Sequence, residues 1–424
     1  MVESIGAPGE RVRLRLAQEE LEGTVLESYE PGIVLVKLGS GYNIGIPREH
    51  ILGGEVLASA SVPVVQKRIP QMTEKPVIGM VITGGTIASV LDPKTGGVKW
   101  VASEEYFAQY YPELFQMVNV KAIRTPFTVA SESMTSDHWM TIAQEVGALV
   151  NDPEIQGVVV THGTDFLGYT AAALSFMLRD LGKPVVLTYS QRSIDRPSSD
   201  AHLNLQCAAR LAIDTAAGVF VVGHATSSDD FCQALVGTKV RKLHSSRRDT
   251  FQPVNTTALA NVWPDKVVYT DSFTARHTKS CVVDAVYSDK VALVKFYPGQ
   301  TPDILDFYAL KYKGIILEAS GFGHLPVSES GNSWIPTLKK HIRGGLLVGC
   351  VTQTIHGRVD PYVYSNGREL MDAGVLFLKD GLAETMLVKL GWILGHYGWK
   401  KDAGTKMLEN VAGEFSDRLI GLNL

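Results

Sequence analysis

The spacing of hydrophobic and polar residues changes twice along the chain. Between residues 9 and 57 apolar residues alternate with polar ones, most clearly at Val12, Leu14 and Leu16, which have arginines between them. This period of two is typical of strands with one buried and one wet face. Proline and glycine turn signals separate the runs, and no helix-length segment intervenes. We therefore expect a small N-terminal β-barrel of SH3-like size over residues 1–57.

From Val77 onward short apolar runs alternate with segments of helical composition. Runs such as "PVIGMVITGG", "IQGVVVTHG" and "GVFVVGH" alternate with "MTIAQEVGALV", "TAAALSFMLRDLG" and "NLQCAARLAI". This alternation is typical of an α/β domain with a parallel, doubly wound sheet. Residues 243–280 are mostly polar and are expected to be irregular. We predict a linker at 58–75, a large α/β domain at 76–287 and a smaller C-terminal α/β domain at 288–424.

Composition narrows the class of protein. The chain has 424 residues, is 45% hydrophobic and carries a formal net charge of −4, so no broad basic surface for nucleic acid is expected. Its four cysteines lie far apart, which favours reduced core residues in a cytoplasmic protein over disulfides or a metal site. No segment has the pattern of a signal peptide or a membrane span.

The first candidate for chemistry follows the first strand of the large domain. "TGGTIAS" contains Gly85 and Thr86. Its two adjacent glycines would let backbone amides approach a ligand next to the Thr86 hydroxyl. It lacks the lysine of a phosphate-binding P-loop. Thr86 could instead be a nucleophile next to an oxyanion site. The alternative is a tight strand–helix turn with hydroxyl capping.

A second candidate, "THGTD", lies between a buried valine run and a helix-prone segment. It holds Gly163, Thr164 and Asp165 at a strand's carboxyl end, where open α/β sheets bind ligands. Thr164 or Asp165 could also simply cap the helix. Lys242, in the polar stretch "GTKVRKLHSSRRDTF", could be solvated, or it could take a proton from Thr164 while Asp165 orients it. Ser131 and Glu132, in "SES", could bind an amino-acid head group or cap the next helix.

Together and in this order, TGGTIAS, SES, HGTD, "QRSIDRPSSDA" and the loop lysine resemble the type I/II L-asparaginase and glutaminase amidohydrolases. The resemblance implies an asparaginase-like two-domain fold without metal or cofactor. It places the nucleophile at Thr86, the second threonine at Thr164 with Asp165 and Lys242, and the substrate head group at Ser131 and Glu132. Gly85, Gly163 and His324 are further substrate-site candidates; His324 belongs to "GFGHLP", which resembles the loop that closes a neighbouring active site.

The N-terminal segment with "GYNIGI" and the C-terminal "VTQTIHGRVDPYVYSNGREL" resemble the D subunits of archaeal glutamyl-tRNA(Gln) amidotransferases over essentially the whole chain. This implies a subunit that hydrolyses glutamine and passes ammonia through a tunnel to the E subunit (GatE). That partner would bind tRNA, ATP and Mg²⁺. It also implies a homodimer within a heterotetramer, with no membrane contact. The barrel's arginines would suit a partner protein or RNA.

One position departs from the family pattern, and two other functions stay open. Pro93 stands near the place of a tyrosine that helps to deprotonate the first threonine, so the sequence leaves the base for Thr86 open. Glu132 replaces a glutamine of many asparaginases, and its carboxylate would suit the substrate's α-ammonium group. The alternatives are a free-standing L-asparaginase or glutaminase and a degenerate scaffold protein.

Overall fold

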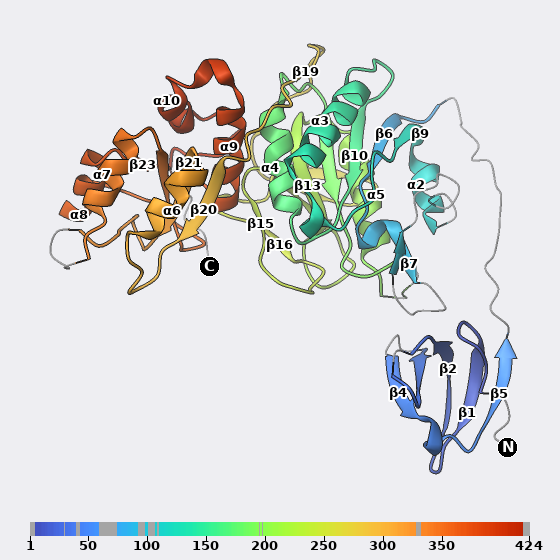
Figure 1. The fold of residues 1–424 in the computed structure, drawn as a ribbon. Coiled ribbons are helices and arrows are strands. Elements are labelled where there is room, and N and C mark those ends of the chain that lie inside the picture. Colours follow the sequence, from blue (N-terminus) through green and yellow to red (C-terminus); the bar gives the residue numbers. More distant parts are fainter. Residues whose placement is uncertain are drawn as a thin grey trace.

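The structure is a computed structural model that describes most of the chain. The described residues are 5–28, 30–39, 43–58, 74–91, 98–100, 107, 110–194, 196, 198–327 and 332–418. Figure 1 shows an N-terminal β-sheet unit, a large central α/β unit and a C-terminal α/β unit. Among the described residues, no helix combines the length and the apolarity needed to cross a bilayer.

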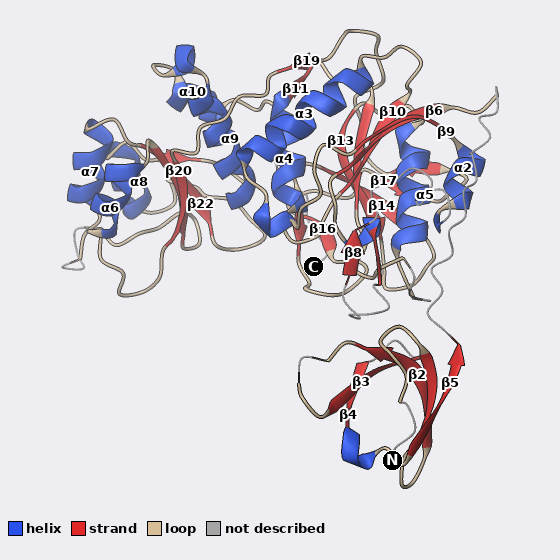
Figure 2. Ribbon diagram, turned by 45° about the vertical axis from the view of Figure 1, so that its right-hand side comes forward, coloured by secondary structure: helices blue, strands red, loops and turns tan. Residues whose placement is uncertain are grey.

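The N-terminal unit is a strongly curved, five-stranded antiparallel sheet (Figure 2). Its strands, in the spatial order β4-β3-β2-β1-β5, are β1 (Arg11–Arg15), β2 (Glu20–Leu26), β3 (Ile33–Leu38), β4 (Asn43–Pro47) and β5 (Gly53–Ala58). Val12 and Leu14 are fully buried in its core, as their alternation predicts. The arginine between them, Arg13, contacts Glu22 at 2.6 Å and Glu55 at 3.6 Å. The charge of this arginine is therefore partly neutralised within the sheet.

The large unit is built on an eight-stranded sheet in the order β18-β17-β14-β13-β12-β10-β6-β9. Its strands are β6 (Val77–Ile82), β9 (Asn119–Arg124), β10 (Gly157–Thr161), β12 (Pro184–Thr188), β13 (Gly218–His224), β14 (Cys232–Val236), β17 (Ala260–Val262) and β18 (Val267–Tyr269). The five neighbouring strands β9, β6, β10, β12 and β13 run parallel to one another, as predicted. Strands β14, β17 and β18 then pair antiparallel, each with its neighbour in the sheet. Residues 243–280, which were expected to be mostly irregular, contain only three short strands, β16 (Phe251–Pro253), β17 and β18. Short strands with polar neighbours give little period-two signal, so the sequence did not indicate them.

Helices cover both faces of this sheet. They are α2 (Pro112–Met117), α3 (Ser136–Val150), α4 (Leu167–Met177) and α5 (Ala201–Ala212). Figure 2 shows α3 and α4 on one side of the sheet and α2 and α5 on the other. Along β10, Val158 and Val160 join the core under α3 and α4, whereas Val159 joins the core under α5. A strand buried on both faces explains the unbroken valine run.

The C-terminal unit has a four-stranded parallel sheet in the order β20-β21-β22-β23. Its elements are β20 (Val291–Lys295), α6 (Ile304–Lys311), β21 (Gly314–Ala319), α7 (Ile335–Arg343), β22 (Leu347–Thr352), α8 (Ser365–Asp372), β23 (Leu376–Phe377), α9 (Ala383–Gly395) and α10 (Ala403–Leu408). Helix α9 packs against α4, where Phe176 and Trp392 stack with ring centroids 5.7 Å apart. The two α/β units therefore share one hydrophobic core.

Three two-stranded pairs complete the described secondary structure. They are β7 (Ser89–Leu91) with β8 (Val98–Trp100), β11 (Leu178–Arg179) with β19 (Val282–Val283), and β15 (Val240–Lys242) with β16 (Phe251–Pro253). Short 3-10 turns lie at Arg48–His50, Thr86–Ala88, Ser131–Ser133 and Tyr397–Trp399. The β15–β16 hairpin carries Lys242 at the end of its first strand. The four cysteines are free and buried, as predicted.

Candidate active site

The two threonine motifs begin side by side, at the carboxyl ends of neighbouring parallel strands. Strand β6 leads into Thr83 and β10 ends at Thr161. The backbone N–H of Thr83 donates to the Thr161 carbonyl at 3.2 Å, and its hydroxyl donates to the same oxygen at 2.8 Å. Both side chains are fully buried. This pairing fixes the start of each loop relative to the other.

The loops then come into direct backbone contact at Gly85. Its φ of 84° lies in the region that L side chains rarely adopt. A Cβ there would lie 2.5 Å from the Gly163 nitrogen and 2.6 Å from the His162 carbonyl oxygen, which are impossible contacts. Glycine is thus needed for two reasons, and it places Thr86 directly beside the second motif.

Thr86 begins a single 3-10 turn that leads into strand β7, so the alternative interpretation, a capped strand–helix turn, is wrong. Gly85 precedes this turn and there is no side-chain capping bond. The Ser89 hydroxyl donates to the Thr86 carbonyl at 2.8 Å and closes the turn. Thr86 itself is partly exposed between buried neighbours. A hydroxyl exposed at the edge of a core is available to a ligand.

Thr164, Asp165 and Lys242 form one polar cluster, although 77 residues separate Asp165 from Lys242. The Lys242 Nζ donates to Thr164 Oγ1 at 2.8 Å and to Asp165 Oδ1 at 2.7 Å. The lysine side chain is only 14% exposed, so the interpretation of a solvated lysine is wrong. The capping interpretation is also wrong, because α4 begins at Leu167 without any side-chain cap. The two side chains are therefore engaged with the lysine.

Ser131 brings the third motif to the same place. It is buried, and its Oγ accepts a hydrogen bond from the Phe166 backbone at 3.4 Å. A Cβ at Gly163 would meet this oxygen at 3.0 Å. The motif does not cap α3, which is capped by Thr135 and His138. The neighbouring Glu132 is exposed.

His162 is a component of the site that the sequence motif contained but to which we assigned no role. It is fully buried, with Nδ1 2.7 Å from the Gly163 carbonyl and Nε2 2.8 Å from the Thr170 hydroxyl. Burial lowers its pKa to about 4, so the ring is neutral near pH 7. Since Nδ1 must donate to the carbonyl, Nε2 accepts from Thr170. The C=O and N–H of a trans peptide point to opposite sides. Because the Gly163 carbonyl accepts from the His162 ring, the N–H of Thr164 points away from that ring.

His324 lies elsewhere, after β21 in the C-terminal unit. It lines a pocket of about 310 Å³ with Phe322 and Tyr364, and its ring meets that of Tyr364 edge-on at 5.1 Å. No hydrogen bond or ring contact within the described part of the chain joins it to Thr86 or Thr164. Its Nε2 is buried without a hydrogen-bond partner among these residues. The structure thus does not bring His324 into the cluster within one chain.

Two further expectations concern the surroundings of the site. Pro93 lies outside the described residues. Over the described ranges, no group of three or more His, Cys, Asp or Glu side chains is arranged to hold a metal ion.

Comparison with known proteins identifies the fold family of the two α/β units. Residues 77–274 match the family model "Asparaginase, N-terminal", and residues 290–407 match "Glutaminase/Asparaginase C-terminal domain". The thermostable L-asparaginase from Thermococcus kodakarensis superposes with a TM-score of 0.71 at 31% identity, over 81% of this chain and 100% of that one. L-asparaginase I from Vibrio cholerae gives 0.69 at 26% identity, over 81% and 99%. The α/β units thus have the asparaginase–glutaminase fold.

Full-length relatives identify the family more closely. Residues 7–57 match the model "GatD N-terminal domain". The D subunit of the glutamyl-tRNA(Gln) amidotransferase of Thermococcus kodakarensis is 46% identical over 93% of this chain and 90% of its own length. That of Pyrococcus furiosus is 44% identical over 94% and 91%. The chain belongs to the family of glutamyl-tRNA(Gln) amidotransferase D subunits.

Proposed function

We propose that this protein is the glutaminase subunit of a glutamyl-tRNA(Gln) amidotransferase. It hydrolyses glutamine to glutamate and ammonia, and a partner subunit uses the ammonia to convert Glu-tRNA(Gln) into Gln-tRNA(Gln). The observation that carries the proposal is the contact of Lys242 with both Thr164 and Asp165. A scaffold that had lost its activity would have no physical need for this contact.

The reaction is an acyl transfer through Thr86. Its hydroxyl oxygen attacks the side-chain amide carbon of glutamine, the C–N bond breaks, and the nitrogen leaves as ammonia after gaining a proton. Water then cleaves the ester on Thr86, which releases glutamate and restores the hydroxyl. Backbone N–H groups of the two touching loops are suited to stabilise the oxyanion.

Thr164 serves proton transfer in this scheme. Because Lys242 donates to the Thr164 oxygen, the hydroxyl proton of Thr164 points away from the lysine. It is therefore free to be given to the leaving nitrogen, and the proton that Thr86 loses on attack replaces it. In the second step a proton of the attacking water returns to the Thr86 oxygen. Asp165 holds the ammonium group of Lys242 in place at 2.7 Å. Neutral His162 adds no competing positive charge beside this unit.

Substrate recognition falls to groups around the same loops. Ser131 and the exposed carboxylate of Glu132 would bind the carboxylate and ammonium groups of the free amino acid. Gly85 and Gly163 leave room for the substrate's backbone to approach. No cofactor is assigned to this chain.

The partner would be the E subunit of the amidotransferase, GatE, which binds tRNA, ATP and Mg²⁺ and receives ammonia through a tunnel. Support comes from the N-terminal sheet, since the Thermococcus asparaginase aligns in full with only 81% of this chain. A free-standing asparaginase is the second candidate, favoured by the same superposition. The four buried free thiols are compatible with a reducing cytoplasm, where we place the complex.

We further propose a homodimer within a heterotetramer. The pocket of His324 is rimmed by Phe322 and Tyr364, whose exposed fractions are 42% and 55%. These exposed aromatic rings, with a histidine nitrogen that has no hydrogen-bond partner in the described part of the chain, are suited to closing the active site of a second copy.

An ammonia-release assay tests the proposal. The purified chain is given glutamine or asparagine, with and without GatE, glutamyl-tRNA(Gln), ATP and Mg²⁺. We expect glutamine hydrolysis that the partner and its tRNA stimulate. Preferential asparagine hydrolysis that ignores the partner would favour the free-standing enzyme. No hydrolysis under any condition would favour the scaffold.

A further inference from the structure

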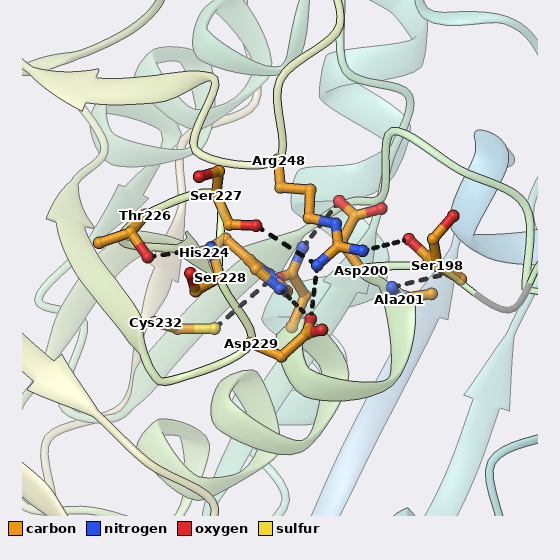
Figure 3. A network of polar contacts seen from close by, with 12 residues as sticks. Ser198, Asp200, Ala201, His224, Thr226, Ser227, Ser228, Asp229, Cys232 and Arg248 are labelled. Atoms are coloured by element: carbon orange, nitrogen blue, oxygen red, sulfur yellow. Dashed lines mark hydrogen bonds and ion pairs between the residues drawn. The ribbon is translucent and has the colours of Figure 1, made fainter.

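A second polar network lies beside the catalytic hairpin and uses none of the residues assigned so far (Figure 3). At its centre the guanidinium of Arg248 reaches two other loops, the one between β13 and β14 and the one before α5. It donates to Asp229 Oδ1 at 2.9 Å, to the Ser198 carbonyl at 2.8 Å and to the Ser227 carbonyl at 3.4 Å. The Arg248 side chain is 17% exposed and Asp229 is 62% exposed, so the arginine is held on the protein side while its carboxylate partner meets water. A planar guanidinium suits such divergent acceptors better than an ammonium group.

His224 ties this arginine to the central sheet. It ends strand β13, its side chain is fully buried, and its Nε2 lies 2.9 Å from the same Asp229 oxygen. Its Nδ1 lies 2.6 Å from Asn204 Oδ1. The Asn204 amide nitrogen faces the Tyr189 carbonyl at 2.9 Å, which fixes Oδ1 as the acceptor for His224. A chain of hydrogen bonds therefore runs from α5 through His224 and Asp229 to Arg248.

The network ends on the hairpin that carries Lys242. Arg248 lies in the loop between β15 and β16, and the N–H of Leu243 donates to the Thr250 carbonyl at 2.7 Å to close that loop. Lys242 pairs directly with Phe251 across the hairpin. The Phe251 ring lies 4.6 Å from that of Tyr189, whose hydroxyl donates to the Arg248 carbonyl at 3.1 Å. Both the side chain and the backbone of Arg248 thus hold the hairpin against the sheet.

We propose that Arg248, Asp229 and His224 are positioning residues for Lys242, which fix the catalytic hairpin at the distance where its ammonium group contacts Thr164 and Asp165. This inference rests on the proposed function of Lys242. None of the three residues touches the reacting atoms in the proposed mechanism. They act through the backbone of the hairpin, and a misplacement of about 1 Å in such a group costs about 100-fold in rate.

The same loop supplies a matched control. Arg247, the adjacent arginine, is 56% exposed, and the side-chain partner that the described residues give it is the nearby Asp249. We therefore compare R248M with R247M in the full complex with GatE, measuring glutamine-dependent ammonia release. R248M should lower kcat about 10- to 100-fold with little change in KM. R247M should match the wild type. R248K should recover part of the loss, because it restores the contact with Asp229 but not the others.

A second set of variants separates positioning from folding. D229N keeps the shape of a largely exposed side chain while it removes the charge, and we expect about a tenfold fall in kcat with the melting temperature preserved. Adding R248M to K242A should change the residual rate no further, because the loss acts through Lys242. Wild-type kcat in both R248M and D229N would overturn the proposal. So would a full additional loss in the K242A background. A fully active K242A variant would instead refute the catalytic role of Lys242.

Discussion

The Nζ of Lys239 lies 2.5 Å from Asp380 Oδ2, and this ion pair joins the two α/β units at a site where both side chains are almost wholly buried. Lys239 is three residues before Lys242. Asp380 also accepts the Ser416 N–H at 3.0 Å. The segment that supplies Lys242 is therefore anchored to the C-terminal unit before it reaches Thr164 and Asp165.

Removing one partner of the Lys239–Asp380 ion pair should destabilise the fold. We expect Asp380→Asn to lower the free energy of unfolding by about 3–5 kcal/mol, because Lys239 would keep a buried charge without a counter-ion. Urea denaturation of the variant and the wild type measures this. Replacing both partners together, as Lys239→Met with Asp380→Leu, should recover most of the loss. A single variant as stable as the wild type would contradict the prediction.

Both threonines should be essential for amide hydrolysis. Thr86→Ala and Thr164→Val each remove one hydroxyl from an acyl-transfer site, and we expect losses of about 10³-fold or more in kcat with the fold intact. Thr141→Ala is the matched control. Thr141 lies within α3, its hydroxyl donates to the Asp137 carbonyl of the same helix, and the variant should be fully active. A folded Thr86→Ala protein with near wild-type ammonia release would rule out Thr86 as the nucleophile.

Lys242 and Thr164 should behave as one unit. Lys242→Ala should be nearly as damaging as Thr164→Val, and the double variant should be little worse than either, because the two groups share one proton-transfer step. Rates of the three variants and the wild type form a double-mutant cycle. Fully multiplicative losses would separate the lysine from the threonine.

His162 should make the protein sensitive to acid. Its pKa is about 4 in the folded state, against about 6.5 when it is exposed by unfolding. Between these pH values the unfolded chain binds more protons than the folded one. The stabilisation by neutral His162 is therefore complete above pH 6.5 and is lost as the pH falls toward 4. The loss amounts to about 3 kcal/mol. Unfolding free energies measured across this range test the expectation.

The matched variants for this test are His162→Gln and His202→Gln. The first cannot titrate, so its stability should fall less steeply with acid, although it is lower at pH 7. His202 is 42% exposed on α5, and its replacement should leave the slope as in the wild type. Identical slopes for all three proteins would show that His162 is not the titrating group.

Glu132 should act on binding more than on chemistry. Its carboxylate would meet the α-ammonium group of glutamine, away from the amide, so Glu132→Gln should raise KM about tenfold or more and leave kcat nearly unchanged. The exposed Glu154, which pairs with Lys121 away from the site, gives the control Glu154→Gln. A fall in kcat at constant KM would contradict a head-group role.

The sequence predicted most of the elements that carry the site, because they are strongly patterned. A valine run buried on both faces and glycine-rich turns at strand ends are local signals, and they located Thr86 and Thr164 correctly after strand ends. That these two strands are neighbours is seen only in the fold. The contact of Lys242 with Thr164 was one of two alternatives that residue chemistry left open, and the resemblance to a family favoured it. Nothing in the spacing of these residues along the chain encodes that contact.

The errors concern what neighbouring side chains do. Helix α4 begins two residues after Asp165 without a side-chain cap, because the carboxylate binds Lys242 instead. Neither Lys239 nor Arg248 had a role predicted from the sequence, yet the first is buried in an ion pair and the second is held by two neighbouring loops. Such partners come from distant segments, so only the fold reveals them. The roles assigned to the site residues, and that of His324 in a second copy, stay predictions.

The backbone contact between Gly85 and the His162–Gly163 peptide has a consequence for engineering this enzyme. The two loops are in backbone-to-backbone contact here, with no side chain between them that could adjust to a change in shape. Transplanting one loop from a related amidohydrolase would therefore fail unless the other came with it. The smallest exchangeable part of this active site is the pair of loops, and variants that alter substrate choice should be built by replacing both together.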